Sequence, residues 1–176
     1  MWKKWIVVAG ALALAGCFDM QSVQPLWTDE TAIQAPLLTG VWQTDMAKEQ
    51  LIVVKAGERK YRAVYLDEDG KATSYDVRVG KMEGVTIADL LPLQDCVAIP
   101  GHAFARIAID EKSLKLQFLD SERLRAKAVE EKLGVRTGKE QAALTASTAA
   151  LYSFLRRNLA AEEKTDWDAA FKRVKE

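Results

Sequence analysis

The chain has 176 residues, and its 25 basic and 25 acidic side chains give no formal net charge at pH 7. Binding to nucleic acid is not expected, because such binding depends on an excess of basic groups that neutralises phosphates. The length suits a single domain with a substantial apolar core.

The first sixteen residues have the pattern of a secretory signal peptide. Lys3 and Lys4 form a short basic start, and the apolar run Trp5–Leu14 follows directly. A transmembrane helix needs about 20 apolar residues, so this run is too short to be one. Removing residues 1–16 would leave two more acidic than basic groups, with no polybasic patch beside the new N-terminus.

The Leu14-Ala15-Gly16-Cys17 order resembles the lipobox of bacterial lipoproteins. That resemblance implies that Cys17 receives a diacylglyceryl thioether, that residues 1–16 are cleaved off and that the new amino group is acylated. Three acyl chains would anchor the protein stably, because one chain alone binds a membrane only marginally. Phe18, not Asp, follows the cysteine, and by the same resemblance this favours the outer membrane, with the domain facing the periplasm. The alternatives are a buried cysteine in an N-terminal helix and an uncleaved signal.

Residues 17–38 are predicted to be the lipidated N-terminus and a tether, because they contain two prolines and show little periodicity. Leu26 and Trp27 could dock back on the domain or rest at the lipid interface. With Cys17 lipidated, Cys96 is the one remaining thiol and cannot form an intramolecular disulfide. It lies in the mostly apolar stretch 93–99, which predicts a buried, unreactive thiol, with an intermolecular bridge as the alternative.

Residues 39–176 predict one β-rich domain with C-terminal helices. Alternating or continuous apolar positions predict about seven strands, and the short turns between them require neighbouring strands to pair antiparallel. These strands are expected at 38–44, 51–56, 60–67, 74–79, 85–88, 102–110 and 114–118. The segment 67–70 is interpreted as a tight turn and not as a calcium loop, because strands flank it and the EF-hand spacing is not met.

After residue 120 the apolar positions follow a helical period. A first helix is predicted from a cap at Asp120 or Ser121 to about Leu133, with Gly134 ending it. Residues 141–144 could supply an eighth strand. A second helix is predicted to follow a cap at Thr145 or Ser147. The segment 165–168 predicts the start of a third short helix, whose buried side would contain Trp167, Ala170, Phe171 and Val174.

Gly40-Val41-Trp42 matches the Gly-x-Trp that opens the first strand of lipocalins, and the chain resembles this family over roughly residues 39–160. The resemblance implies a small barrel, with the tryptophan packed at its closed end and a small apolar ligand inside. The expected fold is therefore mainly β (α+β), as an antiparallel meander sheet or a small lipocalin-like barrel with two to three C-terminal helices. A barrel or sheet without a cavity is the alternative, since eight strands enclose space only for side chains or one small ligand. The residues expected to line a cavity are Trp42, Val53, Tyr65, Val77, Ile107 and Phe118.

Signals for enzyme chemistry are absent from the sequence. His102 is the only histidine, so a multi-histidine metal site is not expected, and we predict a strand-start residue bonded to backbone or water. There is no Gly-x-Ser-x-Gly elbow, and nothing marks a particular pair of carboxylates. We expect no catalytic, cofactor or metal site. The charged residues of the first two late helices are predicted to be solvated.

Two classes of function remain. The first is a membrane-anchored lipoprotein with a non-enzymatic binding or envelope-support role, which contacts another envelope protein through the sheet or the late helices. The second is a lipocalin-like carrier of a small apolar ligand. A carrier needs a continuous apolar cavity, whereas an interaction module would pack those side chains together and expose an apolar patch elsewhere.

Overall fold

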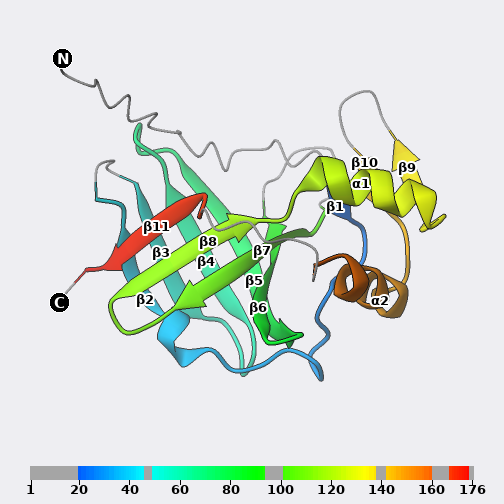
Figure 1. The fold of residues 1–176 in the computed structure, drawn as a ribbon. Coiled ribbons are helices and arrows are strands. Elements are labelled where there is room, and N and C mark those ends of the chain that lie inside the picture. Colours follow the sequence, from blue (N-terminus) through cyan, green and yellow to red (C-terminus); the bar gives the residue numbers. More distant parts are fainter. Residues whose placement is uncertain (1–19, 46–48, 94–100, 138–141, 160–166, 175–176) are drawn as a thin grey trace, which may run out of the picture.

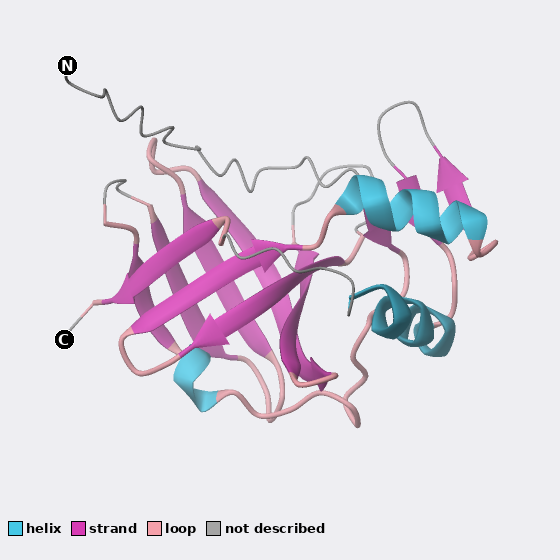
Figure 2. Ribbon diagram, in the orientation of Figure 1, coloured by secondary structure: helices cyan, strands magenta, loops and turns pink. Residues whose placement is uncertain are grey.

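The structure is a computed structural model, and it describes residues 20–45, 49–93, 101–137, 142–159 and 167–174. Eight antiparallel strands close into a barrel, and a second layer of two α-helices and a small sheet lies beside it (Figures 1 and 2). The prediction of a mainly β fold is confirmed. Of the two predicted arrangements, the open meander sheet and the closed barrel, the protein adopts the closed barrel.

Seven of the eight barrel strands follow one another along the chain, each antiparallel to the next. Their inward positions are buried at every second residue, as the predicted alternation requires; in the third of them, for example, Tyr61, Ala63 and Tyr65 face the interior. These strands are β2 (Gly40–Gln43), β3 (Gln50–Lys55), β4 (Tyr61–Leu66), β5 (Ala72–Met82), β6 (Val85–Pro92), β7 (Ala103–Ile109) and β8 (Ser113–Phe118).

The eighth barrel strand, β11 (Ala169–Arg173), lies where the third helix is predicted, so that prediction is wrong. β11 pairs with both β8 and β2 and thereby closes the barrel. An open barrel would leave the backbone groups of those two edge strands unpaired, which is unfavourable for a buried wall. This long-range pairing overrides the local helical pattern, and it turns Phe171 into the barrel.

The second layer contains β1 (Met20–Ser22), β9 (Val135–Thr137), β10 (Ala142–Leu144), α1 (Ser121–Glu130) and α2 (Thr148–Leu159). The expected strand at 141–144 exists as β10, but it pairs with β1 and β9 and takes no part in the barrel. Asp120 caps α1, since its Oδ1 accepts a hydrogen bond from Arg123 N at 3.1 Å. The helix ends at Glu130, before the predicted end near Leu133. Lys132, with φ 56°, adopts the left-handed conformation after the helix, where Gly134 was expected to end it.

The predicted tether is folded from Met20 onward, and it docks on the domain through Leu26 and Trp27, which is one of the two placements expected for these side chains. β1 pairs with β10, and η1 (Pro36–Leu38) leads into the barrel. Between these elements the Trp27 side chain, 2% exposed, lies against Gly80, where a Cβ atom would come within 2.4 Å of the indole ring. Trp27 Nε1 donates to Ile87 O at 3.0 Å, which fastens the segment to the outer wall of the barrel.

Two apolar cores result, one inside the barrel and one between its outer wall and the second layer. The second core contains the expected apolar face of α2, formed by Leu151, Phe154, Leu155 and Leu159. Within the described part of the chain, no helix is long and apolar enough to cross a membrane.

Candidate functional site

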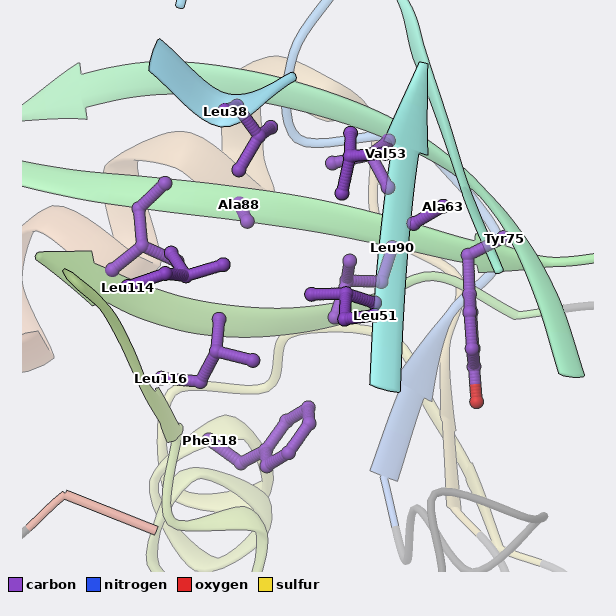
Figure 3. Close-up of a pocket in the computed structure, with 12 residues that line it drawn as sticks. Leu38, Leu51, Val53, Ala63, Tyr75, Ala88, Leu90, Leu114, Leu116 and Phe118 are labelled. Carbon is purple, nitrogen blue, oxygen red and sulfur yellow. The ribbon is translucent and has the colours of Figure 1, made fainter. Parts of the chain in front are cut away.

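An apolar cavity of about 40 Å³ lies inside the barrel. Side chains from β3 to β8 surround it, and Leu38 of η1 reaches it from one end (Figure 3). The inward positions of β4 and β6 include two alanines, Ala63 and Ala88, and such short side chains leave space along the barrel axis. The lining residues are Leu38, Leu51, Val53, Ala63, Tyr75, Val77, Ala88, Leu90, Ile107, Leu114, Leu116 and Phe118.

Four of the six residues predicted to line a cavity do so, namely Val53, Val77, Ile107 and Phe118. Trp42 and Tyr65 belong to the same core but stand outside the lining. Cys17 and Cys96 lie outside the described residues, so their predicted lipidation and burial stay predictions.

The barrel end that carries η1 is closed by Trp42 and Arg173. The Arg173 guanidinium lies 4.1 Å from the centre of the Trp42 ring, a distance at which a cation is attracted to the face of an aromatic system. Arg173 also donates to Thr39 O at 2.8 Å and to Glu111 O at 2.9 Å, and Trp42 Nε1 donates to Leu38 O at 3.0 Å. The Arg173 bonds join β11 to the start of β2 and to the β7–β8 turn at this end of the barrel.

The geometry explains the glycine of Gly40-Val41-Trp42. Gly40 has φ 140°, which other residues rarely adopt, and a Cβ atom there would lie 2.4 Å from Arg173 Nη1. Arg173 was not anticipated as part of this arrangement, because its segment was predicted to be helical.

The opposite end of the barrel, hereafter the mouth, carries buried polar side chains. Tyr65 donates its hydroxyl hydrogen to Glu49 Oε1 at 2.6 Å, and the Glu49 carboxylate is itself buried. The pKa of Tyr65 is raised, mainly by burial and to a smaller extent by the hydrogen bond to Glu49. Burial likewise raises the pKa of Tyr75 to about 12. Both phenols therefore keep their protons at neutral pH.

A buried acid–histidine pair lies outside the barrel, on the wall that faces the second layer. His102 Nδ1 is 2.6 Å from Asp89 Oδ1, and Asp89 Oδ2 accepts a hydrogen bond from Leu26 N at 2.8 Å. The backbone of His102 pairs with Ser22, in line with the prediction of a backbone-bonded strand-start residue, but the carboxylate partner of its side chain was missed.

This pair does not form a catalytic triad with Ser22. The Ser22 hydroxyl donates to Gln24 O at 2.8 Å and accepts from Gln24 N at 3.2 Å, so it is committed to a local turn. Among the described residues no group of three or more histidine, cysteine and acidic side chains could hold a metal ion. Through the bonds from Leu26 to Asp89 and between Ser22 and His102, the pair and its strand fasten the N-terminal segment to the barrel.

A larger hollow of about 490 Å³ lies on the surface between residues 29–30 and the β3–β4 turn. Its charged side chains are already engaged, since Lys60 pairs with Asp29 at 3.0 Å and Arg59 donates to the carbonyls of Asp29 and Glu30. These contacts fasten the N-terminal segment to β3 and β4, as the Asp89–His102 pair does to β6 and β7. The cavity within the barrel is therefore the stronger candidate site. Comparisons of the chain with protein-family models, with curated proteins and with solved structures found no match.

Proposed function

We propose that the protein is a lipid-anchored bacterial envelope protein that binds a small apolar ligand inside its barrel, as the lipocalin resemblance of Gly40-Val41-Trp42 implies. The observation that carries the proposal is the cavity itself, which is lined by inward-facing apolar side chains of six consecutive strands. The apolar lining supports a role in binding.

The cavity volume limits the ligand. One water molecule needs roughly 10–15 Å³ of such space, and drug-sized ligands occupy pockets of about 300–1,000 Å³. At about 40 Å³ the barrel can accept only a small apolar group unless side chains move. Phe118 is half-buried at the mouth end, where β8 ends, and its displacement is the simplest way to enlarge the cavity.

The proposed function includes a lipid anchor at Cys17. Cys17 would be acylated after cleavage of residues 1–16, and the protein would lie on the periplasmic side of the outer membrane. We expect Cys17→Ala to remain unprocessed or mislocalised and to incorporate no labelled palmitate. Normal lipid labelling and unchanged membrane retention of that variant would refute the anchor.

Ligand binding in the barrel can be tested by native mass spectrometry. The sample is the chain from residue 18 onward, purified after export to the periplasm. The proposal expects an apolar adduct that solvent extraction releases. Ala88→Leu, which adds bulk to the cavity lining, should lose the adduct, whereas Ala108→Leu on the exposed side of β7 should keep it. A bare mass for the parent chain, or an adduct that both variants retain, would refute a ligand in the barrel.

A second candidate function is contact with another envelope protein. It is favoured by exposed aliphatic side chains on the outer wall of the barrel at β2, β3 and β11. Val41 and Val54 lie on the outer side of β2 and β3, 37% and 52% exposed, and Val174 follows β11 and bonds to the backbone of Val41. If the barrel binds no ligand, this patch is where partner contacts should be sought, by cross-linking from Val54→Cys.

A further inference from the structure

The distance from the proposed anchor to the folded domain is very short. Cys17 precedes Met20 by three residues, and Met20 is the first residue of β1 and is buried in the second core. Three extended residues span at most about 11 Å. A free tether through residue 38 would have reached about 70 Å, so the folding of residues 20–38 removes most of the expected stand-off from the membrane.

This short connection determines which part of the surface can approach the bilayer. A compact domain of this size has a radius of gyration of about 15 Å, which exceeds the reach of the connection. Only the side that surrounds Met20 can therefore lie against the membrane. The neighbours there are β10, which pairs with Met20 through Ala142, and α1, which packs against both β1 and β9 (Figure 1).

The exposed side of α1 presents one aliphatic side chain close to basic ones. Val129, 59% exposed, has Arg125 four residues before it, so these two lie on one side of α1. Lys132, just beyond the end of the helix, is exposed as well. Arg136 on the neighbouring strand β9 is exposed as well. Two nearby acids are neutralised within the protein, because Glu130 pairs with Lys127 and Glu131 with Arg157.

We propose that this anchor-side face, formed by Arg125, Val129, Lys132 and Arg136, rests on the surface of the bilayer that holds Cys17. The basic side chains would contact anionic phospholipid headgroups, and Val129 would lie among the uppermost acyl carbons. Each basic side chain near such a surface strengthens its binding by roughly fivefold. The proposal rests on the lipid anchor of the proposed function, and it is independent of any ligand in the barrel.

Val129→Cys and Val54→Cys, each in a Cys96→Ser background, provide a matched pair of labelling sites. Both native side chains are exposed valines, but Val54 lies on the outer wall of the barrel, on β3. The processed protein, with its lipids verified by the mass of the N-terminal peptide, would carry a fluorophore at either site. It would be reconstituted in vesicles of phosphatidylethanolamine and phosphatidylglycerol that contain headgroup-labelled nitroxide lipid. We expect a blue shift and quenching at position 129 and neither effect at position 54.

A second measurement requires no cysteine. Lys132 and Lys115 are both exposed, and Lys115 lies on the barrel strand β8. On the vesicles, acetylation of Lys132 by a water-soluble reagent should fall relative to the unlipidated chain from residue 18 onward, and acetylation of Lys115 should not. Arg125→Gln together with Arg136→Gln should weaken both effects, whereas Lys55→Gln together with Lys115→Gln should leave the quenching unchanged.

These measurements distinguish failure of the docked face from failure of the lipid anchor and from failure of the barrel ligand. A lipidated protein with equal labelling behaviour at positions 129 and 54, or with unprotected Lys132, would overturn the docked face while leaving the anchor and the barrel ligand standing. An N-terminal peptide without lipid would overturn the anchor and the docked face together. A missing adduct in the barrel would overturn the ligand alone.

Discussion

Replacing Trp27 by alanine tests whether the N-terminal segment is part of the folded domain. The indole ring is 2% exposed, lies on Gly80, meets the ring of Tyr152 edge to face at 5.9 Å and donates to Ile87 O. Removing a buried tryptophan of this kind costs about 3–5 kcal/mol of unfolding free energy, through lost burial and the cavity left behind. For a domain of this length that corresponds to a fall of roughly 8–16 °C in Tm.

The assay is urea and thermal unfolding of the chain from residue 18 onward, followed by near-UV circular dichroism. Trp167→Ala is the matched control, because that tryptophan is 38% exposed and its loss should change stability far less. If the two variants unfold at the same midpoint, residues 20–38 do not pack as the structure describes, and the short anchor connection has no basis.

Three further results are expected. Gly40→Ala should lower the unfolding free energy by about 1–3 kcal/mol, because it places a Cβ at a positive φ against a guanidinium, whereas Gly57→Ala, with no such φ, should be milder in the same urea titration. Asp89→Ala should cost about 1–3 kcal/mol for each buried donor that it leaves unpaired and should speed amide exchange at Leu26, whereas Asp76→Ala removes only an exposed ion pair worth about 0–1 kcal/mol. Tyr75 keeps its proton in the folded state to about pH 12, whereas the unfolded chain loses it near its ordinary pKa of 10. Stability should therefore fall as the pH rises from about 10 to about 12, and Tyr75→Phe should remove that part of the slope in unfolding measurements across this range.

Local patterns were sufficient for the barrel wall. The alternation that puts Tyr61, Ala63 and Tyr65 on one face is a property of one strand, and the short turns that follow require antiparallel pairing. The cap at Asp120 is equally local, because donor and acceptor are three residues apart. Such features can be inferred before any tertiary contact is known.

The features that were missed depend on partners far away in the sequence. Phe171 lies in a strand because β2 and β8 offer two unpaired edges, and nothing within residues 165–174 indicates this. Asp89 and His102 become a buried pair only because the segment from Ser22 to Leu26 covers them. Docking of the predicted tether stayed open for the same reason: its prolines and irregular spacing are typical of free and of docked segments alike, and the docking surface is provided by other elements.

The barrel wall belongs to both apolar cores, and this couples the anchor segment to the candidate cavity. Along β6, Ile87 faces the second core while the next residue, Ala88, lines the cavity. Along β7, Phe104 lies in the second core and Ile107 lines the cavity. A shift of this wall would disturb both cores, because close-packed interiors transmit strain and do not absorb it. Residues 20–27 are fastened to the same strands through Asp89 and Ile87. Forces acting on the proposed anchor at Cys17 would thus reach the cavity lining directly, which a free tether would have prevented.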